Sequence, residues 1–162
     1  MLQTENNYAF IDSQNVNLGV QSLGWRLSYR KFYAYLKEKY AVKRAYLFIG
    51  FIAKNQKLYN RLSEAGFELV FKPTKIGSDG RIKGNVDSDL VLKTITELPF
   101  YDKAIIASND GDFYSLVQYL NEKGRLEVVL SPNKKYCSTL LHRTAKGKIH
   151  FMNNMRDELE YN

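Results

Sequence analysis

Cysteine and histidine are scarce in this sequence, and their scarcity excludes several kinds of site. The 162 residues include one cysteine, Cys137, and two histidines, His142 and His150. A single thiol rules out an internal disulfide, and these three residues are too few to build a structural zinc site. None of them lies in a nucleophile or acid/base motif, so we interpret them as packing or surface residues. This cysteine usage fits a reducing, cytoplasmic setting best.

Long apolar runs and nucleotide-binding loops are also missing. No segment approaches the ~20 consecutive apolar residues of a membrane span, and the first seven residues lack the basic and apolar parts of a signal peptide. The sequence has neither a Gly-rich phosphate loop with Lys-Ser/Thr nor a dinucleotide fingerprint. These absences predict a protein that does not associate with membranes, and they leave nucleotide-dependent enzymes unsupported.

The composition is that of one globular domain with a basic surface. Apolar residues make up 44% of the chain and charged residues 25%. The formal net charge of +7 favours a polyanionic partner, because a basic surface attracts phosphate groups. The sequence contains no linker, internal repeat or low-complexity segment, so residues 1–162 are expected to form a single domain.

Short apolar runs alternate with segments of helical period, which is typical of strand and helix units around a parallel sheet. Strands are expected at residues 8–12, 44–51, 67–72, 103–107 and 126–130. Helices are expected at residues 29–40, 55–65, from 86 onward, 112–123 and 136–143, followed by a short strand at 149–152 and a fraying polar tail. Gly66 and Gly124 are expected to end two helices in the left-handed conformation. We therefore predict an α/β fold with a mostly parallel central sheet of about five strands flanked by helices.

The helix that begins near Val86 carries an aspartate on its apolar side. The residues that mark its buried face are Leu90, Val91, Ile95 and Leu98. Asp87 points along that face, and because an unpaired buried carboxylate is costly, we assign it to a functional site. Asp89 points the opposite way, where an exposed pair with Lys93 is expected. A first-turn acid also favours a helix N-terminus without any function, and this alternative stays open for Asp87.

Two more aspartates follow the strand at 103–107. Asp110 and Asp112 lie between that strand and the next helix, at the strand's carboxyl end, where open α/β sheets bind ligands. Turn formation or helix capping alone would explain either acid. Together they concentrate negative charge, which Mg²⁺ or Mn²⁺ would relieve through oxygen ligands.

Asp12 ends the first strand, and Asn15 follows three residues later. Here too a turn or cap is an alternative explanation. In a doubly wound sheet, however, the first strand and the strand at 103–107 can be neighbours at the switch point, which would place Asp12 beside Asp110. Three separate segments, including the one with Asp87, would then deliver carboxylates to one crevice.

These segments resemble the NYN domain, in the LabA-like branch of the PIN-like nuclease superfamily. The resemblance rests on YAFIDSQN (residues 8–15), KGNVD (83–87) and SNDGDF (108–113), which match in order and spacing. It implies a PIN-like, Rossmann-like domain that cleaves RNA with Mg²⁺ or Mn²⁺. The residues implied to form the acidic metal centre are Asp12, Asp87, Asp110 and Asp112, with Asn15, Ser108 and Asn109 as supporting polar groups. Ser13 and Asn109 stand where relatives often have glycine, but neither departure removes a carboxylate.

An all-carboxylate centre suits phosphodiester hydrolysis, because one or two bound ions can acidify a water and stabilise the charge on the phosphate. We therefore predict a metal-dependent ribonuclease. One alternative is an RNA-binding regulator that keeps the fold and the acids without turnover. Another is a phosphate-ester hydrolase or phosphoacceptor domain, although Ser13 and Gln14 after Asp12 do not form the Asp-x-Asp pattern common in such enzymes.

RNA is the expected partner, and a homodimer is an assembly that the sequence leaves open. The first candidate contact is a basic hairpin around an Asp79-Gly80 turn. Its cations are Lys72, Lys75, Arg81 and Lys83, with Lys83 nearest the scissile group. The other candidate contacts are Arg26, Arg30 and Lys31, and then Lys134 and Lys135. An ordinary solvated hairpin is the alternative for the first set.

Overall fold

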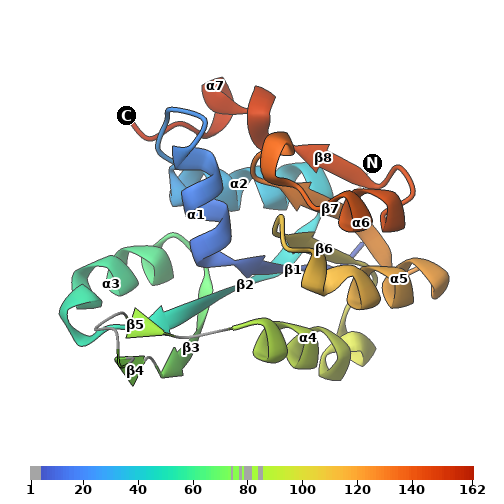
Figure 1. Cartoon of the computed structure of the whole chain (residues 1–162), viewed down its shortest axis with the longest axis horizontal. Coiled ribbons are helices and arrows are strands. Elements are labelled where there is room, and N and C mark those ends of the chain that lie inside the picture. The colour runs from blue at the N-terminus through green and yellow to red at the C-terminus, as the bar shows by residue number, and fades with distance from the viewer. Residues whose placement is uncertain (1–4, 74, 77, 79–81, 84–85) are drawn as a thin grey trace.

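A six-stranded parallel sheet forms the centre of the computed structural model, which describes residues 5–73, 75–76, 78, 82–83 and 86–162 (Figure 1). In chain order its strands are β1 (Asn7–Asp12), β2 (Val42–Phe51), β3 (Glu68–Pro73), β6 (Ala104–Ala107), β7 (Leu126–Ser131) and β8 (Ile149–Phe151). The spatial order is β3-β2-β1-β6-β7-β8, and every neighbouring pair is parallel. The α/β class and the five expected strands are confirmed, and the short strand near residue 149 adds β8 at one edge.

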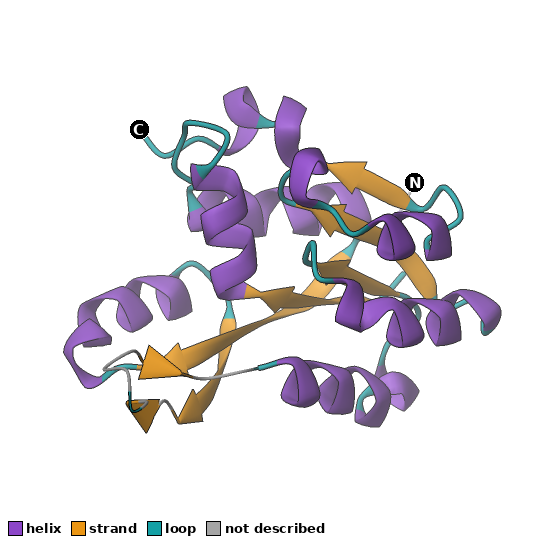
Figure 2. Ribbon diagram, viewed as in Figure 1, coloured by secondary structure: helices purple, strands orange, loops and turns teal. Residues whose placement is uncertain are grey.

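Helices cover both faces of the sheet (Figure 2). One layer contains α1 (Ser13–Gln21), α2 (Tyr29–Tyr40), α3 (Gln56–Glu64) and α7 (Arg156–Leu159), and the other contains α4 (Asp87–Thr96), α5 (Tyr114–Glu122) and α6 (Thr139–Thr144). Strand β1 is buried on both sides because its residues alternate between the two cores. Ala9 and Ile11 pack toward the first layer, and Tyr8 and Phe10 pack toward the second.

Short elements connect the larger ones. They are the 3-10 turns η1 (Ala53–Asn55), η2 (Leu98–Phe100), η3 (Gly111–Phe113), η4 (Lys134–Tyr136) and η5 (Met152–Asn154), and the antiparallel pair β4 (Lys75–Ile76) and β5 (Ile82–Lys83). Gly66 and Gly124 have φ of +119° and +67°, so the left-handed helix ends expected there are confirmed. The helix expected from residue 136 begins only at Thr139, because the hydroxyl of Ser138 accepts the Leu141 N–H and caps it there.

The C-terminal tail is packed against the domain, whereas its polar composition predicted fraying. Leu159 is fully buried in the core beneath α2. Glu160 forms a β-bridge with Leu27, and its carbonyl accepts a hydrogen bond of 2.8 Å from the Lys31 ammonium. One buried leucine and these backbone contacts therefore hold the tail in place.

Helix α4 buries a different stripe from the one expected. Ile95 is 37% exposed, and Thr94 is buried in its place. The Thr94 hydroxyl donates to the Leu90 carbonyl at 2.7 Å, which satisfies the hydroxyl without an external partner.

Within the described residues, no helix is both long enough and apolar enough to cross a membrane.

The ion pair expected between Asp89 and Lys93 is also wrong. Asp89 pairs with Lys72 at 3.4 Å, and Lys93 pairs with Glu97, the residue directly after α4, at 3.1 Å. Helical spacing identifies which acid a lysine can reach along its own helix, but it carries no information about a cation on a neighbouring strand such as β3.

Candidate metal centre and substrate groove

The two central strands bring distant polar residues together at one edge of the sheet. The chain passes from β1 outward to β2 and β3, then crosses to β6 on the other side of β1. Ile11 pairs with Ala107, so the carboxyl ends of β1 and β6 are neighbours. The expected adjacency of these strands is thereby confirmed, and it creates the switch-point crevice in which open α/β sheets bind ligands.

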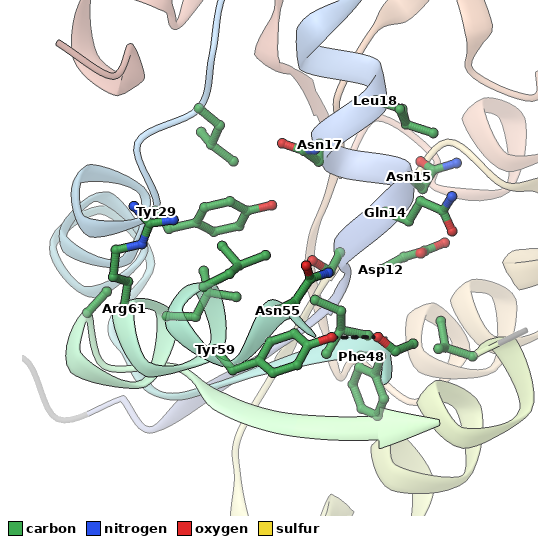
Figure 3. Close-up of a pocket in the computed structure, with 18 of the residues that line it drawn as sticks. Asp12, Gln14, Asn15, Asn17, Leu18, Tyr29, Phe48, Asn55, Tyr59 and Arg61 are labelled. Atoms are coloured by element: carbon green, nitrogen blue, oxygen red, sulfur yellow. Dashed lines mark hydrogen bonds between the residues drawn. The ribbon is translucent and has the colours of Figure 1, made fainter. Parts of the chain in front are cut away.

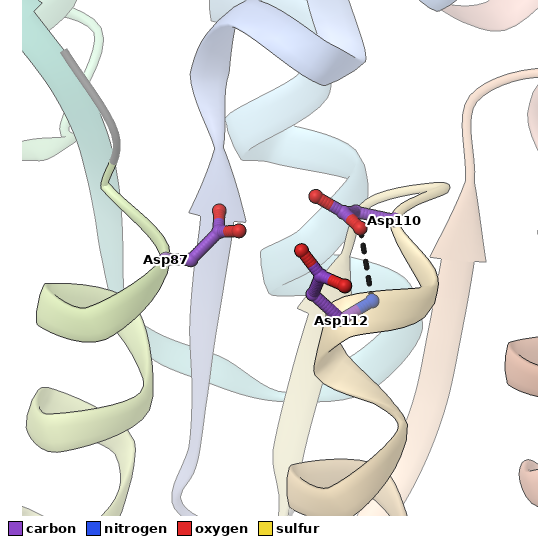
Figure 4. A group of neighbouring side chains, drawn as sticks. All are labelled: Asp87, Asp110 and Asp112. Carbon is purple, nitrogen blue, oxygen red and sulfur yellow. Dashed lines mark hydrogen bonds between the residues drawn. The ribbon is translucent and has the colours of Figure 1, made fainter.

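Three aspartates converge at this crevice. Asp87, Asp110 and Asp112 each place one carboxylate oxygen within 4.8 Å of the others. Asp87 is the first residue of α4, and its side chain points across the end of β1 toward the other two (Figure 4). The Asp112 N–H donates to the Asp110 carboxylate at 2.9 Å, so Asp110 caps η3, a role that the sequence left open for either acid.

Asp12 lies beside this group and is more deeply buried. Its residue is 7% exposed, and its carboxylate accepts a hydrogen bond of 3.3 Å from the Ser108 hydroxyl. Burial raises the pKa of Asp12 to about 6, and the charge of Asp110 adds to the increase. The Asn15 N–H and the Ser108 hydroxyl act in the opposite direction but do not cancel it. Asp12 therefore interacts with the other acids through its charge, but its carboxylate is not one of the three whose oxygens lie within 4.8 Å of one another.

Asp87 is perturbed in the same way. Burial is the largest cause that raises its pKa to about 6, followed by the charges of Asp110, Asp12 and Asp112 and a hydrogen bond with Asp110. Repulsion among acids from three segments is what a divalent cation would relieve. The donor set also fits a hard cation, since all the closest atoms are carboxylate oxygens.

A buried polar network supports the acidic loop. The Ser108 hydroxyl accepts the Asp110 N–H at 3.0 Å, and the Asn15 side-chain oxygen accepts the Asn109 N–H at 2.8 Å. The three supporting residues expected from the sequence therefore contact one another or the acids. Ser131, at the end of β7, was missed, and its hydroxyl donates to the Asn109 side-chain oxygen at 2.5 Å. Its only sequence signal is a serine at the carboxyl end of a buried strand.

The four aspartates open onto a groove of about 1210 Å³ that runs between α1 and α3 (Figure 3). Arg26 and Arg30, both candidate RNA contacts, line this groove, and so does Arg61 of α3. Arg61 carries no sequence signal that distinguishes it from other exposed helical arginines. Lys31 is directed elsewhere, since its ammonium bonds to the carbonyl of Glu160.

The structure describes the basic hairpin only in part. Lys75 pairs with Lys83 across β4 and β5, as expected for a hairpin. The rest of the hairpin lies outside the described residues. This part comprises the expected turn at Asp79-Gly80, Arg81, and the side chains of Lys75 and Lys83. Lys72 is held by Asp89 on the α4 side of the sheet. Lys134 and Lys135 lie over the rings of Phe151 and Tyr136, respectively.

Comparison with known proteins places the chain in a family. A crystal structure of a protein of unknown function from Vibrio parahaemolyticus matches with a TM-score of 0.79 and 24% sequence identity, covering 98% of this chain and 99% of that chain. This likeness shows the fold. None of the curated proteins compared with the sequence matches it significantly. The family model of the NYN domain matches residues 8–153, so the chain belongs to the NYN domain family of PIN-like nucleases.

Proposed function

We propose that this protein is a metal-dependent ribonuclease that hydrolyses RNA phosphodiester bonds at its acidic centre. The observation that carries the proposal is the convergence of Asp87, Asp110 and Asp112, with oxygens within 4.8 Å of one another, beside the buried Asp12. Family membership supports nuclease chemistry, and the three sequence motifs favour the LabA-like branch.

Asp87, Asp110 and Asp112 would hold a Mg²⁺ or Mn²⁺ ion directly. When bound, such an ion lowers the pKa of a water nucleophile and stabilises negative charge on the phosphate and the leaving oxygen. Asp12 adds negative charge from the end of β1, which strengthens the attraction for a cation. Ser108 and Asn15 fix the loop that carries Asp110, so its carboxylate is held in position before metal or substrate arrives.

Histidine and cysteine chemistry is not needed for this reaction. His150 is hydrogen-bonded to the Tyr40 hydroxyl at 2.6 Å, and His142 packs edge-on against Phe151. Burial raises the pKa of the Cys137 thiol, which disfavours the reactive thiolate. All three residues have the packing or surface roles that the sequence suggested.

The direct test is cleavage of single-stranded and structured RNA by purified protein with Mn²⁺, with Mg²⁺ and with chelator. Wild type is expected to cut only with metal, and Asp110→Asn and Asp87→Asn are expected to reduce the rate by at least ~10²-fold, because each removes a charged ligand. Asp89→Asn is the matched control, since Asp89 pairs with Lys72 away from the centre. The nuclease proposal fails if wild type cuts no faster than the first two variants.

The same samples separate the alternatives. An RNA-binding regulator would bind metal and RNA without producing fragments. A phosphate-ester hydrolase would turn over a chromogenic phosphate monoester, and that turnover would be lost in Asp110→Asn. Observing either pattern in the absence of RNA cleavage would replace the ribonuclease proposal.

A further inference from the structure

We infer that the end of the groove away from the acids is a phosphate subsite, and that the groove binds single-stranded RNA along α1. This inference rests on the proposed function, because it assigns a strand and a path to the substrate of the acidic centre. The acids and the arginines belong to one continuous groove. Figure 3 shows Asp12 and Arg61 on opposite sides of it.

Three arginines from separate segments line this groove together with the acids. Arg26 lies in the connection before α2, Arg30 lies in the first turn of α2, and Arg61 lies on α3. All three are exposed, and none forms an ion pair with an acid in the described part of the chain. Besides the four aspartates, Glu64 lines the groove in the described part of the chain. Guanidinium groups that are not neutralised by acids suit phosphate oxygens, which they can bind in a bidentate manner.

An aromatic ring holds one of these arginines. The Arg26 guanidinium lies 4.6 Å from the centre of the Tyr161 ring, and both residues line the groove. Stacking of this kind restricts the arginine to few orientations and leaves its N–H groups at the edge free to bind oxygen. The packed C-terminal tail thus contributes to the groove through Tyr161.

The side of the groove formed by α1, called the wall below, carries no charge and suits unpaired nucleotides. Gln14, Asn17 and Gln21 lie three and four residues apart on α1, so they share one face of the helix, and all three line the groove. Leu18, on the same wall, is 54% exposed. Amides can bond to base edges and 2′-hydroxyls, and an exposed leucine can contact the face of a base. A duplex covers these groups by pairing and stacking, so the wall favours a single strand.

The length of the wall sets a minimum substrate. Gln14 and Gln21 are separated by about 10 Å along α1 at 1.5 Å per residue. At the 3.4 Å per residue of a stacked strand, that span corresponds to at most about three phosphate intervals, and a dinucleotide, with a single internal phosphate, cannot occupy both ends. Affinity is therefore expected to rise with RNA length up to about five nucleotides and then to level off.

The test measures RNA binding by fluorescence anisotropy in chelator, where no metal-dependent cleavage takes place. The triple variant Arg26→Ala/Arg30→Ala/Arg61→Ala is compared with Lys123→Ala/Arg143→Ala/Lys148→Ala. The control residues are exposed, lie outside the groove and change the net charge equally. The groove variant is expected to bind single-stranded RNA at least ~10-fold more weakly and to lower the salt slope by about 2, because each phosphate contact contributes about 0.7. The control is expected to change the slope by less than 1.

Several outcomes would overturn this inference. They are equal losses in the two triple variants, affinity independent of length, or equal affinity for a blunt duplex and a single strand. Equal affinity for DNA of the same sequence would overturn the assignment of RNA. If RNA binding depends on the arginines but no cleavage occurs, only the ribonuclease proposal is refuted. If the triple arginine variant cleaves RNA as fast as wild type, only the phosphate subsite is refuted.

Discussion

The hydroxyl of Ser108 donates a 3.3 Å hydrogen bond to the carboxylate of Asp12, although 96 residues separate the two in the chain. The same oxygen accepts the Asp110 N–H at 3.0 Å. Ser108 is fully buried at the carboxyl end of β6, and Asp12 ends β1. One side chain therefore joins the two strands at the switch point and fixes two of the acids relative to each other.

Replacing this serine tests that connection. Ser108→Ala removes a donor to Asp12 and an acceptor for the Asp110 N–H, and leaving buried polar groups without partners costs about 1–3 kcal/mol. We expect the free energy of unfolding in urea to fall by that amount, and the affinity for Mn²⁺ to fall several-fold because the Asp110 loop loosens. Ser115→Ala, at an exposed position of α5, is the control and should change neither quantity measurably. Identical behaviour of the two variants would show that the network has no role in positioning.

Neutralising one acid should have opposite effects with and without metal. Asp110→Asn relieves repulsion with Asp87 and Asp12, and asparagine still caps η3, so we expect the melting temperature in chelator to rise by a few degrees. Stabilisation by added Mn²⁺ should be lost, because a charged ligand is missing. Thermal scans of wild type, Asp110→Asn and Asp89→Asn with and without Mn²⁺ measure both effects. A lower melting temperature in chelator would argue that the cluster is not under electrostatic strain.

The raised pKa values of Asp12 and Asp87 predict a dependence on pH. Both carboxyls have an ordinary pKa of 3.8, which the folded protein raises to about 6. Between about pH 4 and 6 the folded state retains protons that the unfolded state has lost, so these groups lower the stability of the metal-free protein as pH rises. Protons compete with the metal for the same oxygens, and Mn²⁺ affinity is therefore expected to increase from pH 5 to pH 7.

Calorimetric titration with Mn²⁺ at pH 5, 6 and 7 measures this competition. Wild type is expected to bind Mn²⁺ more tightly at each higher pH and to release protons on binding at pH 6. In Asp87→Asn the increase in Mn²⁺ affinity with pH should be smaller, because one of the two titrating carboxyls is gone. Affinity that stays constant over this range would contradict the shifted pKa values.

The packed tail gives a test of stability that is independent of the site. Leu159→Ala deletes a fully buried side chain beneath α2, and such changes cost about 2–5 kcal/mol. Leu140→Ala is the control, since Leu140 is 44% exposed on α6 and should cost well under half as much. Urea denaturation followed by circular dichroism compares them. Equal stability of Leu159→Ala and wild type would support the fraying that the tail's composition suggested.

Local pattern was sufficient to predict the elements and their order. Apolar runs and helical periods located the five central strands within two residues, because burial on both faces leaves a continuous apolar signature. The same pattern placed Asp12 and Asp110 at strand ends. Their adjacency could also be predicted, because a doubly wound sheet allows few arrangements of its first strand and its crossover.

The sequence by itself determined the α/β class, the positions of the acids and the family to which its motifs point, because each depends on residues close together in the chain. Tertiary structure alone decided that Asp12 lies beside rather than within the closest group, that Asp89 pairs with Lys72, and that Arg61 shares a groove with Arg26. These relationships join elements far apart in sequence. Periodicity shows which face of an element is buried, but the neighbour on that face is set by how helices and strands pack across the whole sheet.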